Sequence, residues 1–207
     1  MLALAIRAFA LCLTIALLQA CGGLQREPEP EELTLPQSQS QHWVELEQVR
    51  QDDWYLLLNT GREALDWRLR AIDSAVSSID MQTFIWTLDG VGSLVRDRLL
   101  AAAQRGVRVR VLVDDSFTAV EDAALREFDS HPGIDVRLFN PYENRSTQAT
   151  MRVALNLGDF KRLDHRMHNK VLISDGRAAI IGGRNTAAEY FGYDPADNFR
   201  DIEVIAG

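Results

Sequence analysis

The sequence predicts an α/β domain with a largely parallel sheet, and three observations support that expectation. From Trp54 onward, short apolar runs of strand length alternate with longer segments whose apolar residues recur at helical spacing. Strand–helix–strand units of this length usually build parallel sheets. Hydrophobic residues make up 46% and charged residues 25% of the 207 residues, the composition of a globular domain with a real core.

The elements follow one another in a regular order. Strands are expected at residues 54–58, 79–86, 107–113, 134–139, 171–173 and 178–181. Helices are expected at 64–76, 94–103 and 119–128. Asn59, Thr60 and Gly61 supply a turn and a helix cap before the first helix, and Gly106 ends the second. Residues 201–207 alternate like a strand that lacks a closing element, so we expect a chain cut from a larger protein.

Residues 140–164 are expected to form a long, polar, Arg-rich loop. Loops of this length in compact domains often carry function. Its arginines are equally compatible with phosphate or lipid head-group contacts and with solvated charges. They are Arg145, Arg152 and Arg162, with Arg166 directly after the segment.

The first twenty residues are expected to be a signal peptide rather than part of the fold. Arg7 precedes an apolar run over residues 8–18 that is too short to span a membrane. Leu18-Gln19-Ala20-Cys21 resembles the bacterial lipobox, which implies acylation of Cys21. An ordinary signal peptide with an incidental cysteine is the alternative. Cys12 lies inside the signal, so the mature chain has no cysteine pair to form a disulfide.

Residues 21–52 are expected to be an acidic and polar linker, and residues 53–207 the folded domain. The linker contains alternating Glu and Pro followed by alternating Gln and Ser, which leaves little to bury. The net charge of the chain is −8, so no global basic field attracts nucleic acid. We therefore expect no nucleic-acid partner, although a nuclease remains a minor alternative.

The residues that carry chemistry are concentrated between His168 and Asn185. His168 and Lys170 are two apart on an extended segment and so share one face. Asp175 and Gly176 form a turn, after which the chain returns as a paired strand. Asn185 then lies near His168 and Lys170 if the two strands pair in register. An imidazole, an ammonium and an amide at one rim can bind and attack a phosphate.

This segment resembles the motif of the phospholipase D superfamily. That motif is His-x-Lys, four residues, Asp, six residues, Gly-Ser or Gly-Gly, any residue, and Asn. The matching residues are His168, Lys170, Asp175, Gly182, Gly183 and Asn185. Segments 79–86, 106–115, 189–192 and 199–201 extend the likeness to the N-terminal half of bacterial cardiolipin synthase-type lipoproteins.

The resemblance implies a sandwich in which helices flank a mixed, mostly parallel sheet, one motif-bearing half of a pseudo-twofold pair. It also implies that His168 is the nucleophile or the acid/base, and that Lys170, Asn185 and Gly183 contact the phosphate. Asp175 is counted with the catalytic motif and is expected to fix the strand end. Asp201 is the candidate for orienting the histidine, ahead of Asp194 and Asp197. No metal or cofactor is implied.

An active site of this family needs two such motifs, and the chain has one. A C-terminal half or a homodimer is expected to supply the second. The expected reaction transfers a phosphatidyl group from phosphatidylglycerol or phosphatidylethanolamine to give cardiolipin. Hydrolysis by water and an inactive half-domain that only binds are the alternatives. The expected location is the bacterial cell envelope, lipid-anchored and facing the periplasm.

Two further groups of residues are expected to be structural. Asp114 and Asp115 are expected to end a strand and enter a turn rather than bind a metal, because no histidine is nearby in sequence. The aromatic residues Phe84, Trp86, Tyr190 and Phe191 are expected in the core. Among them, Trp86 is the best candidate for a contact with a lipid chain.

Overall fold

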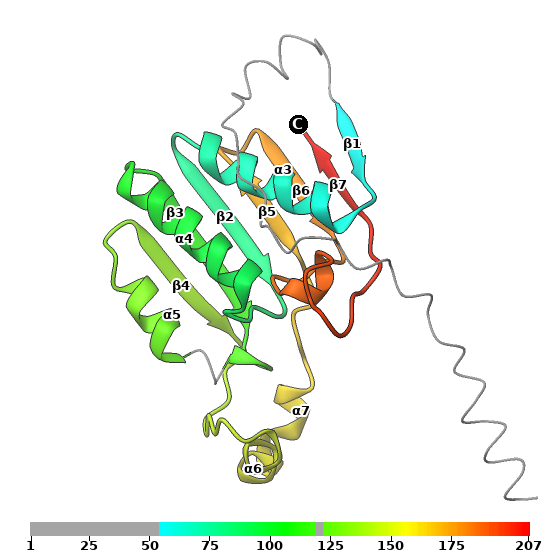
Figure 1. Ribbon diagram of the computed structural model, residues 1–207. Coiled ribbons are helices and arrows are strands. Elements are labelled where there is room, and N and C mark those ends of the chain that lie inside the picture. The colour runs from blue at the N-terminus through cyan, green and yellow to red at the C-terminus, as the bar shows by residue number, and fades with distance from the viewer. Residues whose placement is uncertain (1–53, 119–121) are drawn as a thin grey trace, which may run out of the picture.

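The computed structural model describes residues 54–118 and 122–207, and a seven-stranded mixed sheet forms its centre (Figure 1). The strands are β1 (Tyr55–Leu58), β2 (Ser78–Thr83), β3 (Arg108–Asp114), β4 (Ile134–Phe139), β5 (Val171–Ser174), β6 (Ala178–Gly182) and β7 (Glu203–Ala206). The α-helices are α3 (Gly61–Ser74), α4 (Gly90–Gln104), α5 (Asp122–Asp129), α6 (Ala149–Leu155) and α7 (Phe160–Leu163). Two 3₁₀ helices, η2 (Leu157–Asp159) and η3 (Ala188–Tyr190), complete the described elements. The mixed α/β class is confirmed.

The expectation of a mostly parallel sheet is wrong. The strand order is β1-β7-β6-β5-β2-β3-β4, and only the β2–β3 and β3–β4 pairs are parallel. The pairs β1–β7, β7–β6, β6–β5 and β5–β2 are antiparallel. The cause lies between β4 and β5. Helices α6 and α7 lie beyond the end of the sheet instead of crossing its face, so β5 re-enters in the opposite direction (Figure 1).

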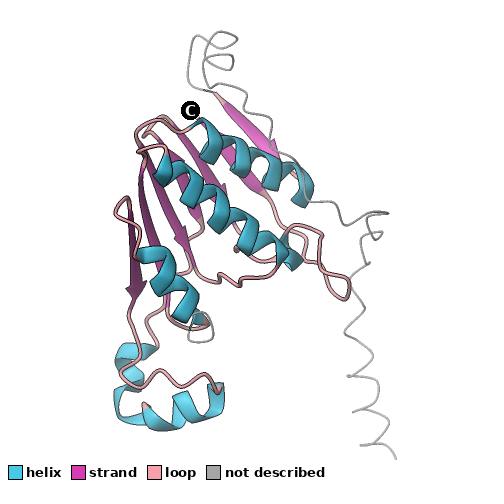
Figure 2. Ribbon diagram, turned by 60° about the vertical axis from the view of Figure 1, so that its left-hand side comes forward, coloured by secondary structure: helices cyan, strands magenta, loops and turns pink. Residues whose placement is uncertain are grey.

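Helices α3, α4 and α5 cover one face of the sheet (Figures 1 and 2). Thr60 caps α3 by accepting a hydrogen bond from the Glu63 amide, as its sequence predicts. The buried faces of the helices, including Leu65, Ile72 and Leu99, pack in one core with alternate residues of the strands, such as Ile79. The periodicity read from the sequence therefore places these residues correctly.

The opposite face of the sheet divides into two halves. Across β1, β7, β6 and β5 the register aligns apolar residues, for example Leu57, Val204, Ile181 and Val171. Across β2, β3 and β4 the same face carries charged residues. The ion pair between Arg110 and Asp80 joins two of these strands.

The segment expected to be a loop contains secondary structure. Residues 140–164 include α6, η2 and α7, which form a small lobe at the end of the sheet where β2, β3 and β4 terminate (Figure 1). Strand β2 ends at Thr83 rather than at Trp86, and Trp86 instead forms an isolated bridge with Thr186. Helix α5 is described from Asp122, so the first residues of the expected 119–128 helix lie outside the described part.

The expected signal peptide, the acylated Cys21 and the linker all lie outside the described residues, as does residue 53 at the expected domain start. Within residues 54–118 and 122–207, every helix is too short or too polar to traverse a bilayer.

Candidate active site

His168 and Lys170 lie in extended chain immediately before β5, at the end of the sheet that adjoins the α6–α7 lobe. The His168 side chain is exposed, whereas Lys170 is buried. Both contact the ring of Phe84, which follows the last residue of β2. The His168 ring centroid is 4.9 Å from that of Phe84 in an edge contact, and the Lys170 Nζ atom is 5.3 Å from the same centroid. The structure thus brings the two motif residues together.

The Lys170 side chain is buried and is held by a hydrogen bond of its own segment. Its Nζ donates a 2.8 Å hydrogen bond to the backbone carbonyl of His168. Burial lowers the pKa of Lys170 below its ordinary value, and the negative charge of Asp201 opposes that shift. A phosphate bound here would restore the lost solvation of the ammonium.

Asn185 joins the same cluster through the chain after β2. Its Oδ1 accepts a 3.0 Å hydrogen bond from the backbone amide of Ile85, the neighbour of Phe84. The hairpin of β5 and β6 pairs in register, from Val171 with Ile181 to Ser174 with Ala178, as expected. Nδ2 of Asn185 has no hydrogen-bond partner among the described residues. It is therefore available to donate to a phosphoryl oxygen.

Asp201 lies against Gly183. A Cβ atom at residue 183 would come within 2.2 Å of both carboxylate oxygens of Asp201. The space beside Gly183, which was expected to admit the phosphate, is thus occupied by the carboxylate of Asp201. In the described part Asp201 makes no hydrogen bond to His168. Its Oδ1 accepts from the backbone amide of Ile202 at 2.8 Å, so the role of Asp201 in orienting the histidine stays a prediction.

Asp175 lies at the other end of β5, roughly 20 Å along the extended chain from His168. It adopts a left-handed backbone conformation, with φ 55°, in the β5–β6 turn. Its carboxylate accepts hydrogen bonds from the backbone amides of Val76, Ser77 and Ser78. Counting Asp175 among the catalytic residues is therefore not supported by this geometry, and its expected function of fixing the strand end is what the contacts show.

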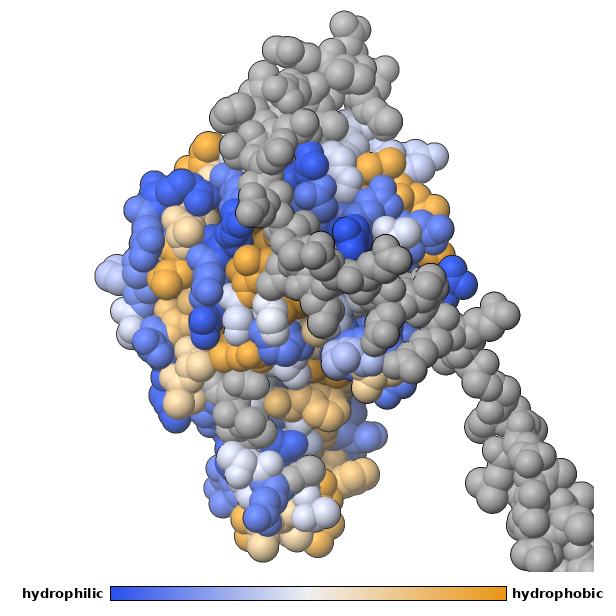
Figure 3. Space-filling model, viewed as in Figure 1, coloured by the Kyte–Doolittle hydropathy of each residue, from blue (hydrophilic) through white to orange (hydrophobic). Residues whose placement is uncertain are grey.

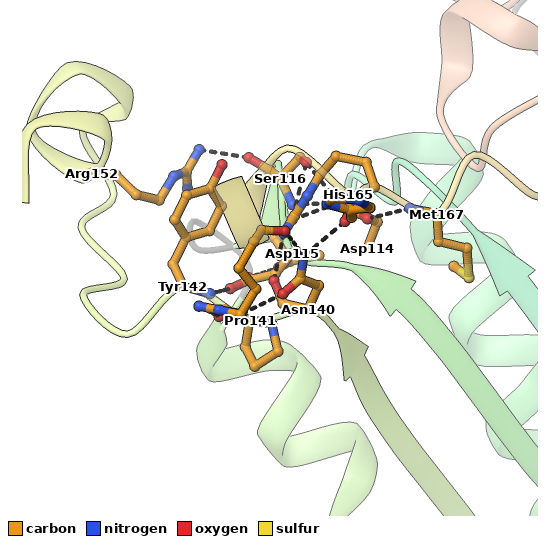
Figure 4. A network of polar contacts seen from close by, with 12 residues as sticks. Asp114, Asp115, Ser116, Asn140, Pro141, Tyr142, Arg152, His165 and Met167 are labelled. Carbon is orange, nitrogen blue, oxygen red and sulfur yellow. Dashed lines mark hydrogen bonds and ion pairs between the residues drawn. The ribbon is translucent and has the colours of Figure 1, made fainter. Parts of the chain in front are cut away.

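Sequence reasoning missed the part of Asp114 in the site. This buried carboxylate at the end of β3 accepts a 2.8 Å hydrogen bond from the backbone amide of Met167, the residue before His168 (Figure 4). It also accepts from the Arg166 guanidinium at 3.1 Å and from Ser116. Asp114 thus holds the chain that presents the histidine. The position of Asp114 at the end of an apolar strand could be read from the sequence. Its partner Met167 could not, because it lies 53 residues further along the chain.

The arginines of the lobe are engaged within the domain. Arg145 pairs with Asp115 and Asp122, and Arg162 pairs with Asp159. Arg152 donates to the carbonyl of Ser116, and Arg166 pairs with Asp114. These contacts favour a structural role over phosphate binding. Asp114 and Asp115 at the end of β3 thus accept hydrogen bonds from N–H and O–H donors of the domain. No group of three or more potential metal ligands occurs in the described ranges.

The aromatic residues divide between the core and the site. Trp86 is buried and donates from Nε1 to the Gly92 carbonyl at 3.1 Å, and Phe191 is also buried. Trp86 is therefore a core residue, and its selection as the best candidate for a lipid contact finds no support. Phe84 is the aromatic residue that contacts the motif. It packs edge-on against Phe117, whose side chain is exposed.

Comparisons with known proteins match this arrangement. The family described as "Cardiolipin synthase, PLD-like domain" matches residues 69–199. Cardiolipin synthase C of Escherichia coli K12 is 44% identical over 149 residues, covering 72% of this chain and 31% of that protein. Cardiolipin synthase B of the same strain is 35% identical over 135 residues, covering 65% of this chain and 30% of that protein. The chain thus spans about a third of the length of these relatives.

Among solved structures, NucT from Helicobacter pylori superposes with a TM-score of 0.55 at 16% identity, covering 75% of this chain and 86% of that chain. This likeness supports the fold. The family match extends over most of the described domain and includes His168, Lys170 and Asn185. The chain belongs to the family of cardiolipin synthase, PLD-like domains.

Proposed function

We propose that this chain contributes one half of the active site of a phosphatidyltransferase that makes cardiolipin from two phospholipids. The observation that carries the proposal is the shared contact of His168 and Lys170 with Phe84. That contact sets an exposed imidazole beside a buried ammonium. Asn185 adds an amide donor, and relatives named cardiolipin synthases support the choice of substrate.

The proposed reaction has two displacement steps. An imidazole nitrogen attacks the phosphorus of a phospholipid, the bond from phosphorus to the leaving alcohol oxygen breaks, and a second histidine gives that oxygen a proton. A hydroxyl of the acceptor lipid then attacks the phosphohistidine. The phosphorus–nitrogen bond breaks, and the hydroxyl proton passes to the second histidine. His168 supplies one of the two imidazoles, and the other comes from a second motif.

Lys170 and Asn185 are proposed to stabilise charge on the phosphoryl oxygens. Preorganised donors in a site that excludes water stabilise a transition state more strongly than mobile ones. The hydrogen bond from Lys170 to the His168 carbonyl and the one from Ile85 to Asn185 fix both donors before substrate binds. Asp201 lies against Gly183, and its negative charge acts on the Lys170 ammonium.

The second motif is proposed to come from a C-terminal half or from a second copy of the chain. Location is a separate proposal. We propose that Cys21 is acylated, that the signal peptide is removed and that the domain faces the periplasm at a membrane of the cell envelope. The mass of the mature N-terminal peptide, compared between the natural chain and Cys21→Ser, tests acylation directly.

Lipid mass spectrometry tests the reaction. The chain is incubated in detergent with phosphatidylglycerol, alone and with the C-terminal half of a relative supplied, and compared with His168→Ala. The matched control is His165→Ala, which removes an exposed imidazole three residues away. We expect cardiolipin from the natural and control chains and none from His168→Ala.

Each other product pattern has a defined meaning. Phosphatidic acid without cardiolipin would replace transfer by hydrolysis. Product from the chain alone would assign the second motif to a homodimer. Cardiolipin made equally well by His168→Ala would contradict the proposal.

A further inference from the structure

Helix α6 has its polar side facing the domain. Arg152 is buried, and its guanidinium donates 2.6 Å to the Ser116 carbonyl and lies 5.2 Å from the Tyr142 ring. Asn156, which ends the helix, is also buried and donates to the carbonyls of Arg152 and Asn144. A surface helix of a globular protein normally buries its apolar side instead.

The outward side of the lobe is apolar. We call this set the apolar lobe surface, and its side chains are between 48% and 66% exposed. Its members are Met151, Val153, Leu155, Leu157 and Phe160. Single exposed apolar residues are ordinary, but five within ten residues of sequence at one end of a molecule indicate an interaction surface.

The apolar lobe surface lies at the end of the molecule that carries the candidate site. Figure 3 shows apolar residues exposed among polar ones at the lower end, where Figure 1 places α6 and α7. Helix α7 ends at Leu163, and the chain then reaches His168 within five residues. A surface that contacts the lobe therefore also approaches the exposed imidazole.

The basic side chain that the lobe offers to an anionic surface is Lys161. The arginines of residues 140–170 are engaged within the domain, by ion pairs or by a bond to the Ser116 carbonyl. Lys161 is exposed directly beside Phe160 and has no ion-pair partner among the described residues. Basic residues flanking an apolar helix face are typical of segments that lie in a bilayer interface, where they contact anionic head groups.

We propose that the apolar lobe surface enters the interfacial region of an anionic phospholipid bilayer and sets His168 at the level of the head groups. Met151, Leu155 and Phe160 would lie among the upper acyl chains, and Lys161 among the phosphates. The proposal rests on the proposed function, because it takes the substrate to be a lipid in a bilayer. The tests below allow the two to fail separately.

The depth of the lobe in vesicles is the direct measurement. Leu157→Trp places an indole on the apolar lobe surface, and Val76→Trp places one at an exposed position outside the lobe. The full chains are reconstituted in phosphatidylglycerol-containing vesicles with and without lipids brominated on the upper acyl chain. The emission of the natural chain, which has four tryptophans, is subtracted from that of each variant. We expect the emission added by the Leu157→Trp indole to shift to shorter wavelength in vesicles. We also expect brominated lipid to quench it several-fold more than the emission added by Val76→Trp.

Equal quenching of the two variants would overturn the proposal. So would an emission shift of Leu157→Trp that is already complete without vesicles, since the surface would then be covered by the chain itself or by a second copy of it. Emission that depends on the fraction of anionic lipid supports the part assigned to Lys161, and Lys161→Gln should then weaken the response.

Activity separates this inference from the proposed function. With the second motif supplied, Leu157→Ser combined with Phe160→Ser should lower the rate on vesicles about tenfold and leave the rate on a short-chain, monomeric phosphatidylglycerol unchanged. Equal losses on both substrates would contradict the bilayer contact. A natural chain that turns over neither substrate would instead contradict the proposed function, while the quenching result stands by itself.

Discussion

The ring of Phe84 is the residue-scale feature that joins the two motif side chains. Phe84 contacts both His168 and Lys170. Its hydrocarbon ring has no group that can transfer a proton or attack phosphorus. Phe84 is therefore a positioning residue. Its backbone neighbour Ile85 binds Asn185, so one short segment after β2 orders three motif residues.

We predict that Phe84→Leu lowers kcat about threefold to tenfold with little change in KM, because a cation–π contact of this kind contributes about 1 kcal/mol. Loss of the ring also removes a stabilising contact of the Lys170 ammonium. The alkaline limb of the pH–rate profile should then move to lower pH. Phe84→Tyr should restore both properties, and Phe139→Leu, at a partly exposed ring on β4, should change neither. A rate loss without any movement of the limb would indicate a purely structural effect.

Asp175 supports the fold from the far end of β5. Burial alone would raise the pKa of Asp175, but the hydrogen bonds from Ser78, Val76 and Ser77 outweigh it and hold the pKa below the ordinary 3.8. Its stabilising contribution is thus fully present above pH 3.8 and is lost as the pH falls through the lower, folded-state pKa.

We predict that Asp175→Asn lowers the free energy of unfolding by about 1–2 kcal/mol at neutral pH, allowing for partial exposure. Asparagine tolerates the left-handed backbone of this residue, so the change isolates the lost charge. Urea titrations at neutral pH and below about pH 3 test this, and the difference between the two chains should shrink on acidification. Activity per folded molecule should be unchanged. A difference independent of pH would contradict the assignment.

At the scale of elements, the end of β3 holds the segment that enters β5. Asp114 binds the Met167 amide and the Arg166 guanidinium, so the last residue of one strand fixes the approach to another strand that is not its neighbour in the sheet. A separate hydrogen bond, from the Arg152 guanidinium of α6 to the Ser116 carbonyl, connects the lobe to the segment that follows β3.

We predict that Asp114→Asn lowers the free energy of unfolding by about 3 kcal/mol, because it leaves Arg166 beside a neutral group in a largely buried place. Hydrogen exchange at the Met167 amide should accelerate more than exchange in β3 itself. Asp97→Asn, at an exposed pair with Arg96, should cost no more than about 1 kcal/mol. Unchanged exchange at Met167 would show that Asp114 does not hold this segment.

The sequence predicted most elements because their periodicity is local. The helix cap at Thr60, the stop at Gly106 and the β5–β6 hairpin all depend on neighbouring residues. Strand direction was not predictable in the same way, because it depends on where α6 and α7 lie relative to the sheet. The roles of Phe84 and Asp114 depend on contacts with residues far along the chain, which periodicity does not encode.

At the scale of the whole molecule, a buried ion pair joins helix α3 to strand β7. Glu203 of β7 accepts hydrogen bonds from both terminal guanidinium nitrogens, Nη1 and Nη2, of Arg68 in α3, and Arg184 lies 3.9 Å from the same carboxylate. All three side chains are almost completely buried. Gly182 and Gly183 directly precede Arg184, and Gly182 lies close against Glu203, so this cluster adjoins the glycines of the motif.

We predict that Glu203→Gln lowers the free energy of unfolding by about 3–5 kcal/mol, since it leaves buried guanidinium groups without their counter-charge. Denaturant titration measures the change. Asp135→Asn, which breaks an exposed pair with Arg137 on β4, is the matched control and should cost less than about 1 kcal/mol. Comparable losses from the two variants would mean that burial does not strengthen the Glu203 contacts.

Strand β7 lies between β1 and β6 in the sheet and pairs with both. A ribosome delivers these strands in sequence order, so β1 emerges first and must wait for β7 before it can pair. Until then β1 has no partner and β6 presents an open edge, and such edges are templates for aggregation. Synthesis and any transport of this chain therefore favour chaperones that shield the early strands, and cleavage just before Glu203 would leave β1 and β6 without the strand that both pair with.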